Sequence, residues 1–293
     1  MRSRPASVGS MTGEFTEGHY VLGIEGLALL RAGAERRLDQ VAQRTGELAE
    51  VLAGLGREPY SAPRTLPEAK VAGGYAGWAL SYDDPGNDTI ALEEPAVRAL
   101  LDELPSGPVL DAACGTGRHT AYLLQAGRTV IGVDSSPEML ARAQSKLPGA
   151  DLREGSLDAL PFPDGCVTGA VCALALSHLP SLGPAVSELA RVLSPGGRVV
   201  ISNPHPFATA LLGWRAVYVD EDGIRTMIPE HAHMPGDYVR AFAEAGLAVR
   251  RCLEPALTDE DARARAKAGQ EEAFAAALTG VPAVIVWEAE KPA

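Results

Sequence analysis

The pattern of apolar and polar positions first indicates a strand, a turn and a helix in residues 109–118. The apolar run ends at Asp111, a turn of small residues follows, and a helical pattern begins after it. Residues 129–134 repeat the first half of this order, because a β-branched run ends at a second acid, Asp134. A helix capped by Ser135 then follows, as indicated by a proline in its first turn and by Glu138, three residues after Ser135. The order strand, helix, strand, helix predicts a Rossmann-like α/β fold.

A second helical pattern lies ahead of this segment. Between Leu27 and Leu55, apolar positions recur at alternating steps of three and four residues, with charged positions on the other side. This predicts one long amphipathic helix, which ends at glycines before Pro59. The helix either packs on its own core or serves as a homodimer contact or a substrate lid, and the pattern leaves these roles open. We predict a disordered start at residues 1–13 and a helical cap at residues 14–74, of which residues 57–74 form a linker.

The rest of the chain, residues 75–293, is predicted to form the main domain. Residues 206–236 break the regular pattern, which predicts an irregular insertion on the substrate side. Regular elements return after it, namely a helix at 237–245, a strand at 247–252, an alanine-rich helix at 262–278 and a strand at 283–287.

Composition narrows the class of protein. The chain has 293 residues, of which 46% are hydrophobic, and a net charge of −12 at pH 7. It can therefore bury a full core, while an acidic surface repels the phosphate backbone of nucleic acids. No apolar run is long enough to span a bilayer, and no signal-peptide pattern is present. The cysteines lack paired spacing, as is typical of reduced thiols: Cys114, Cys166, Cys172 and Cys252. We expect a cytoplasmic protein that acts on a small molecule, with no nucleic-acid partner and no membrane insertion.

The turn after Asp111 has the chemistry of a cofactor site. Gly115 and Gly117 let the backbone approach a ligand where a Cβ atom would collide. Asp134 ends the next strand, the position at which such folds bind ribose hydroxyls. A nicotinamide site would carry a third glycine where Thr120 stands, and two acids suit a pyrophosphate poorly. A cation without phosphate fits better, which favours S-adenosylmethionine.

Five ordered segments then give the chain a family resemblance. They are residues 111–117, Asp134, and residues 154–162, 171–179 and 188–201. Through these segments the chain resembles the class I S-adenosylmethionine-dependent methyltransferases, and the resemblance spans about residues 75–254. Within that class it is similar to the small-molecule branch, which includes the methyltransferases of ubiquinone and menaquinone biosynthesis. The resemblance implies a seven-strand sheet of order 3-2-1-4-5-7-6 with helices on both faces and the seventh strand antiparallel. It also implies methyl transfer to O, C or N of a small, hydrophobic metabolite.

The resemblance further implies where the cofactor binds. The implied cofactor-binding residues are Tyr75, Tyr82, Asp111, Ala113, Cys114, Gly115, Gly117, Asp134, Ser135, Met139, Ser156, Leu157, Ala173 and His178. Two positions depart from the family pattern. Ala113 stands where glycine is usual, which narrows the allowed backbone angles. Ser156 stands where an aspartate usually binds the adenine amino group, so that its hydroxyl, or Asp158, would accept instead. The aromatic rings of Tyr75 and Tyr82 either cover the cofactor or pack in the core.

Histidines are the candidate bases. A hydroxyl or acidic-carbon nucleophile needs a base whose pKa is near neutrality. His178 follows the fourth predicted strand, His205 follows the fifth, and His231 lies in the insertion. Each has a structural alternative, such as a helix cap for His178 or a rigid pocket wall for His205. No third ligand accompanies His231 and His233, so no metal site is predicted, and His119 is expected in solvent.

Two other functions stay open at this point. One is a protein that binds the same cofactor without methyl transfer, as a cyclase or a structural protein. The other is a nicotinamide oxidoreductase, which would be stabilised by NAD rather than by S-adenosylhomocysteine.

Overall fold

The computed structural model describes residues 14–84, 87–220 and 222–293. The predicted disordered start, residues 1–13, lies outside them. The described chain forms two compact units. A helical unit takes residues 14–66 and 257–281, and a larger unit takes residues 67–256 and 282–293.

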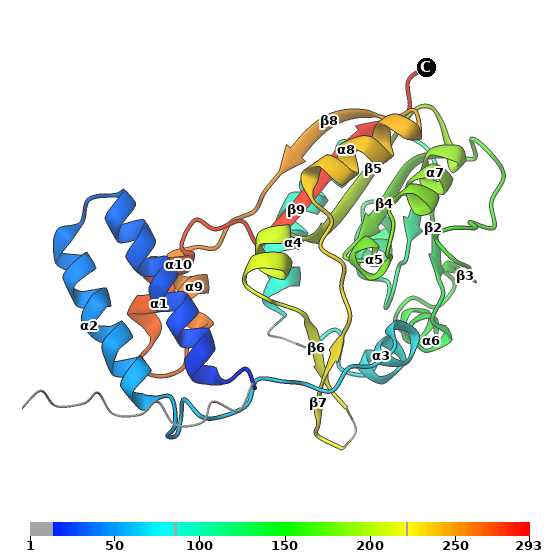
Figure 1. Ribbon diagram of the computed structural model, residues 1–293. Helices are drawn as coiled ribbons and strands as arrows, with labels where there is room; N and C mark the ends of the chain where they lie inside the picture. The colour runs from blue at the N-terminus through cyan, green and yellow to red at the C-terminus, as the bar shows by residue number, and fades with distance from the viewer. Residues whose placement is uncertain (1–13, 85–86, 221) are drawn as a thin grey trace, which may run out of the picture. The chain divides into compact units, whose positions relative to one another are not determined.

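The larger unit is built on a seven-stranded sheet (Figure 1). Its strands are β1 (Val109–Ala112), β2 (Val130–Asp134), β3 (Asp151–Glu154), β4 (Val167–Ala173), β5 (Leu193–Pro204), β8 (Ala248–Leu253) and β9 (Val284–Glu290). They lie in the order β3-β2-β1-β4-β5-β9-β8. The first five are parallel, and β9 is antiparallel to both β5 and β8. The predicted order is confirmed, with β8 as the sixth strand of that scheme and β9 as the seventh.

Helices cover both faces of this sheet because its strands are apolar on both sides. Val109, Val171 and Val200 face one layer, which contains α4 (Asp88–Asp102) and α5 (Arg118–Gln125). Leu110, Cys172 and Ile201, one residue further along each strand, face the other. That layer contains α7 (Gly183–Val192) and α8 (Pro235–Glu244). The central parallel strands β1, β4 and β5 thus have the two-sided burial of an α/β core. The carboxyl ends of the parallel strands form one edge that is free for a site.

The segment between β5 and α8 is more regular than expected. Residues 206–236 contain a short π-helical turn, Phe207–Leu211, and a hairpin of β6 (Ala216–Val219) and β7 (Arg225–Ile228). The predicted linker, residues 57–74, also ends in structure. Backbone hydrogen bonds join Met227 of β7 to Pro67 and Ala69, and α3 (Val71–Trp78) begins directly after them. The hairpin therefore holds α3 in place, an interaction across about 160 residues that local patterning does not indicate.

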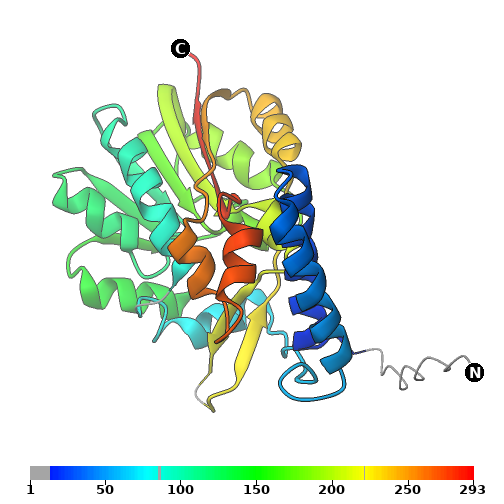
Figure 2. The ribbon, with the colours of Figure 1, turned by 90° about the vertical axis from the view of Figure 1, so that its left-hand side faces the viewer.

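The helical unit corrects two predictions. The single long helix is two, α1 (Glu17–Ala34) and α2 (Leu38–Gly54), because the chain turns at Arg36 with a φ of 58°. The predicted helix at 262–278 is likewise two, α9 (Asp259–Ala264) and α10 (Glu271–Leu278). Figure 2 shows α10 beside α1, where Arg31 donates to the Ala277 carbonyl at 2.7 Å. Residues 257–281 therefore pack with the N-terminal helices, whereas the sequence-based division assigned them to the main domain.

Candidate functional site

The turn between β1 and α5 lies at the carboxyl edge of the sheet. Three of its residues have positive φ, 59° at Ala113, 54° at Gly115 and 82° at Gly117. A Cβ added at Gly115 would meet no atom within 4 Å, so the backbone there is open to a ligand. At Gly117 a Cβ would lie 2.9 Å from Leu147, so this glycine instead allows close packing.

Asp134, at the end of β2, is prepared to bind hydroxyl groups. Its Oδ2 accepts from the Gly115 amide at 2.7 Å and its Oδ1 from the Ser136 amide at 2.8 Å. Each oxygen keeps a lone pair for a further donor, as the two hydroxyls of a ribose require. Burial raises the pKa of Asp134, although these hydrogen bonds act to lower it. These residues thus fit a nucleoside. The cap of α6 (Pro137–Lys146) is Ser136, one residue later than expected, and its Oγ accepts from the Met139 amide.

Asp111 supports the turn from beneath. It is fully buried, and its Oδ2 accepts from the Thr120 hydroxyl at 2.6 Å. Burial raises its pKa, while His119 and Thr120 act in the opposite direction. Thr120 occupies the place of the third glycine in a nicotinamide site, so its side chain here has a structural use.

A buried ionic cluster anchors the start of α5, and the sequence reading missed it. Glu93 of α4 accepts from Arg118 at 2.7 Å, from Ser202 of β5 at 2.7 Å and from the His119 ring at 3.2 Å. His119 is 3% exposed, so its expected place in solvent is wrong. Although burial opposes ionisation, the His119 hydrogen bond and the Arg118 charge lower the pKa of Glu93 to about 2.

Aromatic side chains from α3 and the turn after it lie beside the glycine-rich turn. Tyr75, Trp78 and Tyr82 contact one another with ring centroids 4.9–6.2 Å apart. The next residue, Asp83, joins this segment to the glycine-rich turn and to α6, because it accepts from Thr116 and from Lys146, each at 2.7 Å. The predicted pair Tyr75 and Tyr82 therefore lies near the glycine-rich turn, and these ring contacts fit either alternative, a cofactor cover or core packing.

His178 makes the most specific contact in the site. It ends a 3-10 turn, Leu176–His178, after β4. Its Nδ1 lies 2.9 Å from the Pro229 carbonyl, which can only accept, so Nδ1 carries the ring proton. Its Nε2 is then the acceptor for the Tyr75 hydroxyl at 2.6 Å. Burial lowers the pKa of His178, which keeps the ring neutral with its basic nitrogen toward Tyr75.

Glu230, whose charge acts on Tyr75 of this pair, was not predicted. Its carboxylate accepts from the Ser177 hydroxyl at 3.2 Å and from the Ala216 amide at 2.9 Å. Burial raises its pKa. No spacing signal could have indicated Glu230, because it reaches the site only through the hairpin fold of residues 206–236.

The other histidines are placed differently. His205 is 2% exposed; the Phe207 amide donates to its Nδ1, and its Nε2 donates to Glu254 at 3.0 Å. Both ring nitrogens are thus engaged away from Tyr75, which suits the pocket-wall alternative. His231 is exposed and donates its backbone amide to the Ser177 carbonyl. Across the described ranges, no group of three His, Cys, Asp or Glu residues could hold a metal ion.

The remaining predicted cofactor residues line the same edge with fewer contacts. Ser135 and Ser156 are exposed, and Ser156 donates to Asp158, the alternative adenine acceptor. Leu157 and Ala173 are half-buried against the core. Cys114 is buried, which raises its thiol pKa and makes it a packing residue.

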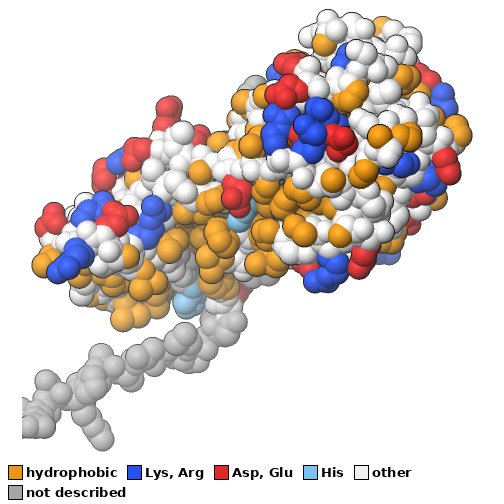
Figure 3. All heavy atoms as spheres, turned by 90° about the horizontal axis from the view of Figure 1, so that it is seen from above, with side chains coloured by type: hydrophobic (Ala, Val, Ile, Leu, Met, Phe, Trp, Pro, Cys, Tyr) orange, Lys and Arg blue, Asp and Glu red, His pale blue; other side chains and the backbone are white. Residues whose placement is uncertain are grey.

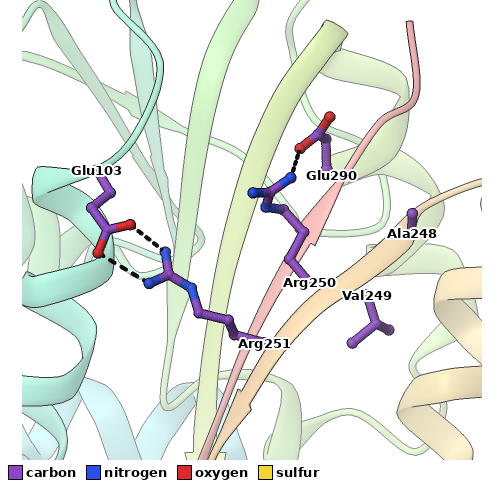
Figure 4. Close-up of a pocket in the computed structure, with 6 residues that line it drawn as sticks. All are labelled: Glu103, Ala248, Val249, Arg250, Arg251 and Glu290. Atoms are coloured by element: carbon purple, nitrogen blue, oxygen red, sulfur yellow. Dashed lines mark hydrogen bonds and ion pairs between the residues drawn. The ribbon is translucent and has the colours of Figure 1, made fainter.

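A groove at the opposite edge of the sheet offers no comparable chemistry. Its six lining residues are Glu103, Ala248, Val249, Arg250, Arg251 and Glu290 (Figure 4). Arg251 donates to both oxygens of Glu103, and Arg250 donates to Glu290 at 2.6 Å. Basic side chains on the face in Figure 3 are likewise mixed with acidic ones. Neither observation favours a phosphate-rich partner. None of the described helices is long and apolar enough to cross a bilayer.

Comparisons with known proteins agree with this site. Residues 110–201 match the family model described as a methyltransferase domain. Over 94 residues the chain is 42% identical to a malonyl-[acyl-carrier protein] O-methyltransferase of Pectobacterium atrosepticum. The aligned span covers 32% of this chain and 37% of that protein. Over 137 residues it is 34% identical to a demethylmenaquinone methyltransferase of Beutenbergia cavernae, 45% of this chain and 57% of that one.

A solved structure extends the likeness to the fold. The S-adenosylmethionine dependent methyltransferase from Mesorhizobium loti aligns with a TM-score of 0.53 and 26% identity, over 68% of this chain and 97% of that one. The chain thus spans about half or less of the curated relatives it matches, and most of the solved one.

Proposed function

We propose, from the class I S-adenosylmethionine-dependent methyltransferase domain that this chain contains, that the protein methylates O, C or N of a small, hydrophobic molecule. S-adenosylmethionine is the methyl donor of this domain class, and it supplies an electrophilic methyl group on a sulfonium. One observation carries the proposal: the neutral His178 and Tyr75 adjoin the Asp134 site. A base thus lies beside the place of the donor.

The residues of the chain divide the work between them. Asp134 and the turn at Gly115 hold the nucleoside. The Tyr75 hydroxyl, which donates to His178 Nε2, occupies the position where a substrate donor would bind. When a substrate hydroxyl or ammonium replaces it, Nε2 accepts the proton. General bases of this kind contribute roughly 10²–10⁴-fold to rate.

Apolar side chains in the insertion support a hydrophobic substrate. Large hydrophobic residues remain exposed there, at Phe207, Leu211, Val219, Ile224 and Met234. The insertion follows β5 at the carboxyl edge of the sheet, where ligands bind in α/β folds, and exposed apolar groups are typical of binding surfaces.

Binding and turnover test the proposal in two steps. S-adenosylhomocysteine should raise the melting temperature and NAD should not; the reverse result would favour the oxidoreductase. Labelled S-adenosylmethionine with a panel of hydroxyl, amine and carbon-acid acceptors should then give a labelled product. Binding without any transfer would favour the cyclase or structural alternative. His178→Gln should lower kcat by about 10²-fold, while S-adenosylhomocysteine should still raise the melting temperature of the variant.

A further inference from the structure

Two short segments, one with a carboxylate and one with a base, are joined by hydrogen bonds. The His231 amide donates to the Ser177 carbonyl at 2.6 Å, the Ser177 hydroxyl to Glu230 at 3.2 Å, and His178 Nδ1 to the Pro229 carbonyl at 2.9 Å. These three hydrogen bonds hold the segments of Glu230 and His178 together, and the Glu230 charge acts on Tyr75, the hydrogen-bond partner of His178.

Glu230 has only neutral donors among the described contacts. Ser177 Oγ and the Ala216 amide each bond one oxygen, which leaves a lone pair on both. Arg215 is the cation whose charge acts on it, but this guanidinium donates to the carbonyls of Thr209 and Trp214. A half-buried carboxylate without a direct ion pair is costly in free energy, and a cationic ligand would offset that cost.

Aromatic rings from three elements form a series of contacts that includes Tyr75, the ring on which the Glu230 charge acts. Tyr75 and Trp78 of α3 have centroids 6.0 Å apart, and Trp78 lies 6.2 Å from Tyr218 of β6. The His178 ring meets Tyr75 at 5.1 Å. Aromatic rings near a carboxylate are a recognised environment for alkylammonium ions, because the ring faces attract positive charge.

We propose that the methyl acceptor is an amine, bound as an ammonium between Glu230 and the rings of Tyr75, Trp78 and Tyr218. The inference rests on the proposed function and specifies its substrate class. The ammonium gives one proton to His178 Nε2. The nitrogen lone pair then forms the N–C bond while the C–S bond breaks and sulfur keeps its electron pair. The products are S-adenosylhomocysteine and a methylated ammonium, which carries the positive charge.

The charge pattern favours this class over an anionic nucleophile. Burial, Tyr82, Glu230 and Asp134 all raise the pKa of the Tyr75 hydroxyl, so they oppose a negative charge at that position. A phenolate or enolate would meet the same opposition, whereas an ammonium would be attracted.

Binding of a matched pair of probes tests the charge requirement. The protein loaded with S-adenosylhomocysteine is titrated in a calorimeter with (4-hydroxyphenyl)trimethylammonium and with its neutral isostere, 4-tert-butylphenol. We expect the cation to bind at least about tenfold more tightly. Glu230→Gln should reduce this preference to about threefold or less, and Trp78→Leu should also reduce it. Glu244→Gln, an exposed control on α8, should leave it intact. Because the readout is a ratio within one variant, a partial loss of folded protein does not alter it.

Turnover separates this inference from the proposed function. With labelled S-adenosylmethionine, phenethylamine should be methylated and 2-phenylethanol should not. Transfer only to hydroxyl or carbon acceptors, equal binding of the two probes, or an unchanged preference in Glu230→Gln would refute the amine assignment and leave the methyltransferase proposal standing. Failure of S-adenosylhomocysteine to bind would refute both.

Discussion

Replacing Glu93 with glutamine should destabilise the larger unit strongly. Glu93 is fully buried and accepts hydrogen bonds from Arg118, His119 and Ser202. An amide cannot neutralise Arg118, and its NH₂ group would face a donor. Removing one member of a buried ion pair costs roughly 3–5 kcal/mol.

The pKa of Glu93 gives a second estimate of this cost. Its pKa is about 2 in the folded protein, against an ordinary value of 4.5. At about 1.4 kcal/mol per unit, this difference corresponds to about 3 kcal/mol. Because the pKa is lowered, this contribution is fully present above pH 4.5 and is lost as the pH falls toward 2. The two estimates agree.

Tryptophan fluorescence during urea unfolding measures the effect. All three tryptophans, Trp78, Trp214 and Trp287, belong to the larger unit, so the signal reports on it alone. At pH 7 we expect Glu93→Gln to lower the free energy of unfolding by about 3 kcal/mol. Glu94→Gln is the matched control: Glu94 is 24% exposed and 3.4 Å from Arg118, so it should cost less than about 1 kcal/mol. A similar cost for both variants, or an unchanged acid dependence in Glu93→Gln, would refute the reasoning.

Three further outcomes are expected. Ala113→Gly should raise the free energy of unfolding by about 0.5 kcal/mol, because a side chain at φ 59° costs roughly 1–2 kcal/mol and the flexibility of glycine offsets part of the gain. The same urea titration checks this, and a lower free energy of unfolding would contradict it. The acid limb of kcat/KM should lie below pH 6.5, since burial lowers the pKa of His178; a limb above 6.5 would argue against His178 as the base. Burial, partly opposed by Arg44, raises the pKa of Glu25 to about 7, so the helical unit should lose stability as the pH rises from 5 to 8. Far-ultraviolet circular dichroism should show that loss in the wild type and a smaller one in Glu25→Gln.

The sheet could be predicted because its signals are local. The parallel strands other than β3 each contain a short apolar run and are followed by turn residues, so the order of elements is readable along the chain. The break at Arg36 was not readable, since the apolar period continues across it and arginine rarely adopts positive φ. Local pattern therefore located the strands but not where a long helical period folds back.

The site divides in the same way. Gly115, Gly117 and Asp134 occupy fixed positions relative to their strands, and the cofactor follows from them. Glu93 and Glu230 act on residues far away in sequence, at separations of 25 to 109 residues for Glu93 and 53 for Glu230 with Ser177. Their roles come from tertiary packing, and only the folded chain shows them.

The position of β9 has a consequence for how the protein is made. Trp287, in this strand, is paired with Ile201 of β5 on one side and Cys252 of β8 on the other. During synthesis β8 leaves the ribosome about 30 residues before its neighbour in the sheet, and residues 257–281 of the helical unit emerge between them. Until β9 arrives, β5 and β8 both present open backbone edges. The last strand thus completes the interior of the sheet, so deleting its seven residues would split the sheet rather than shorten it.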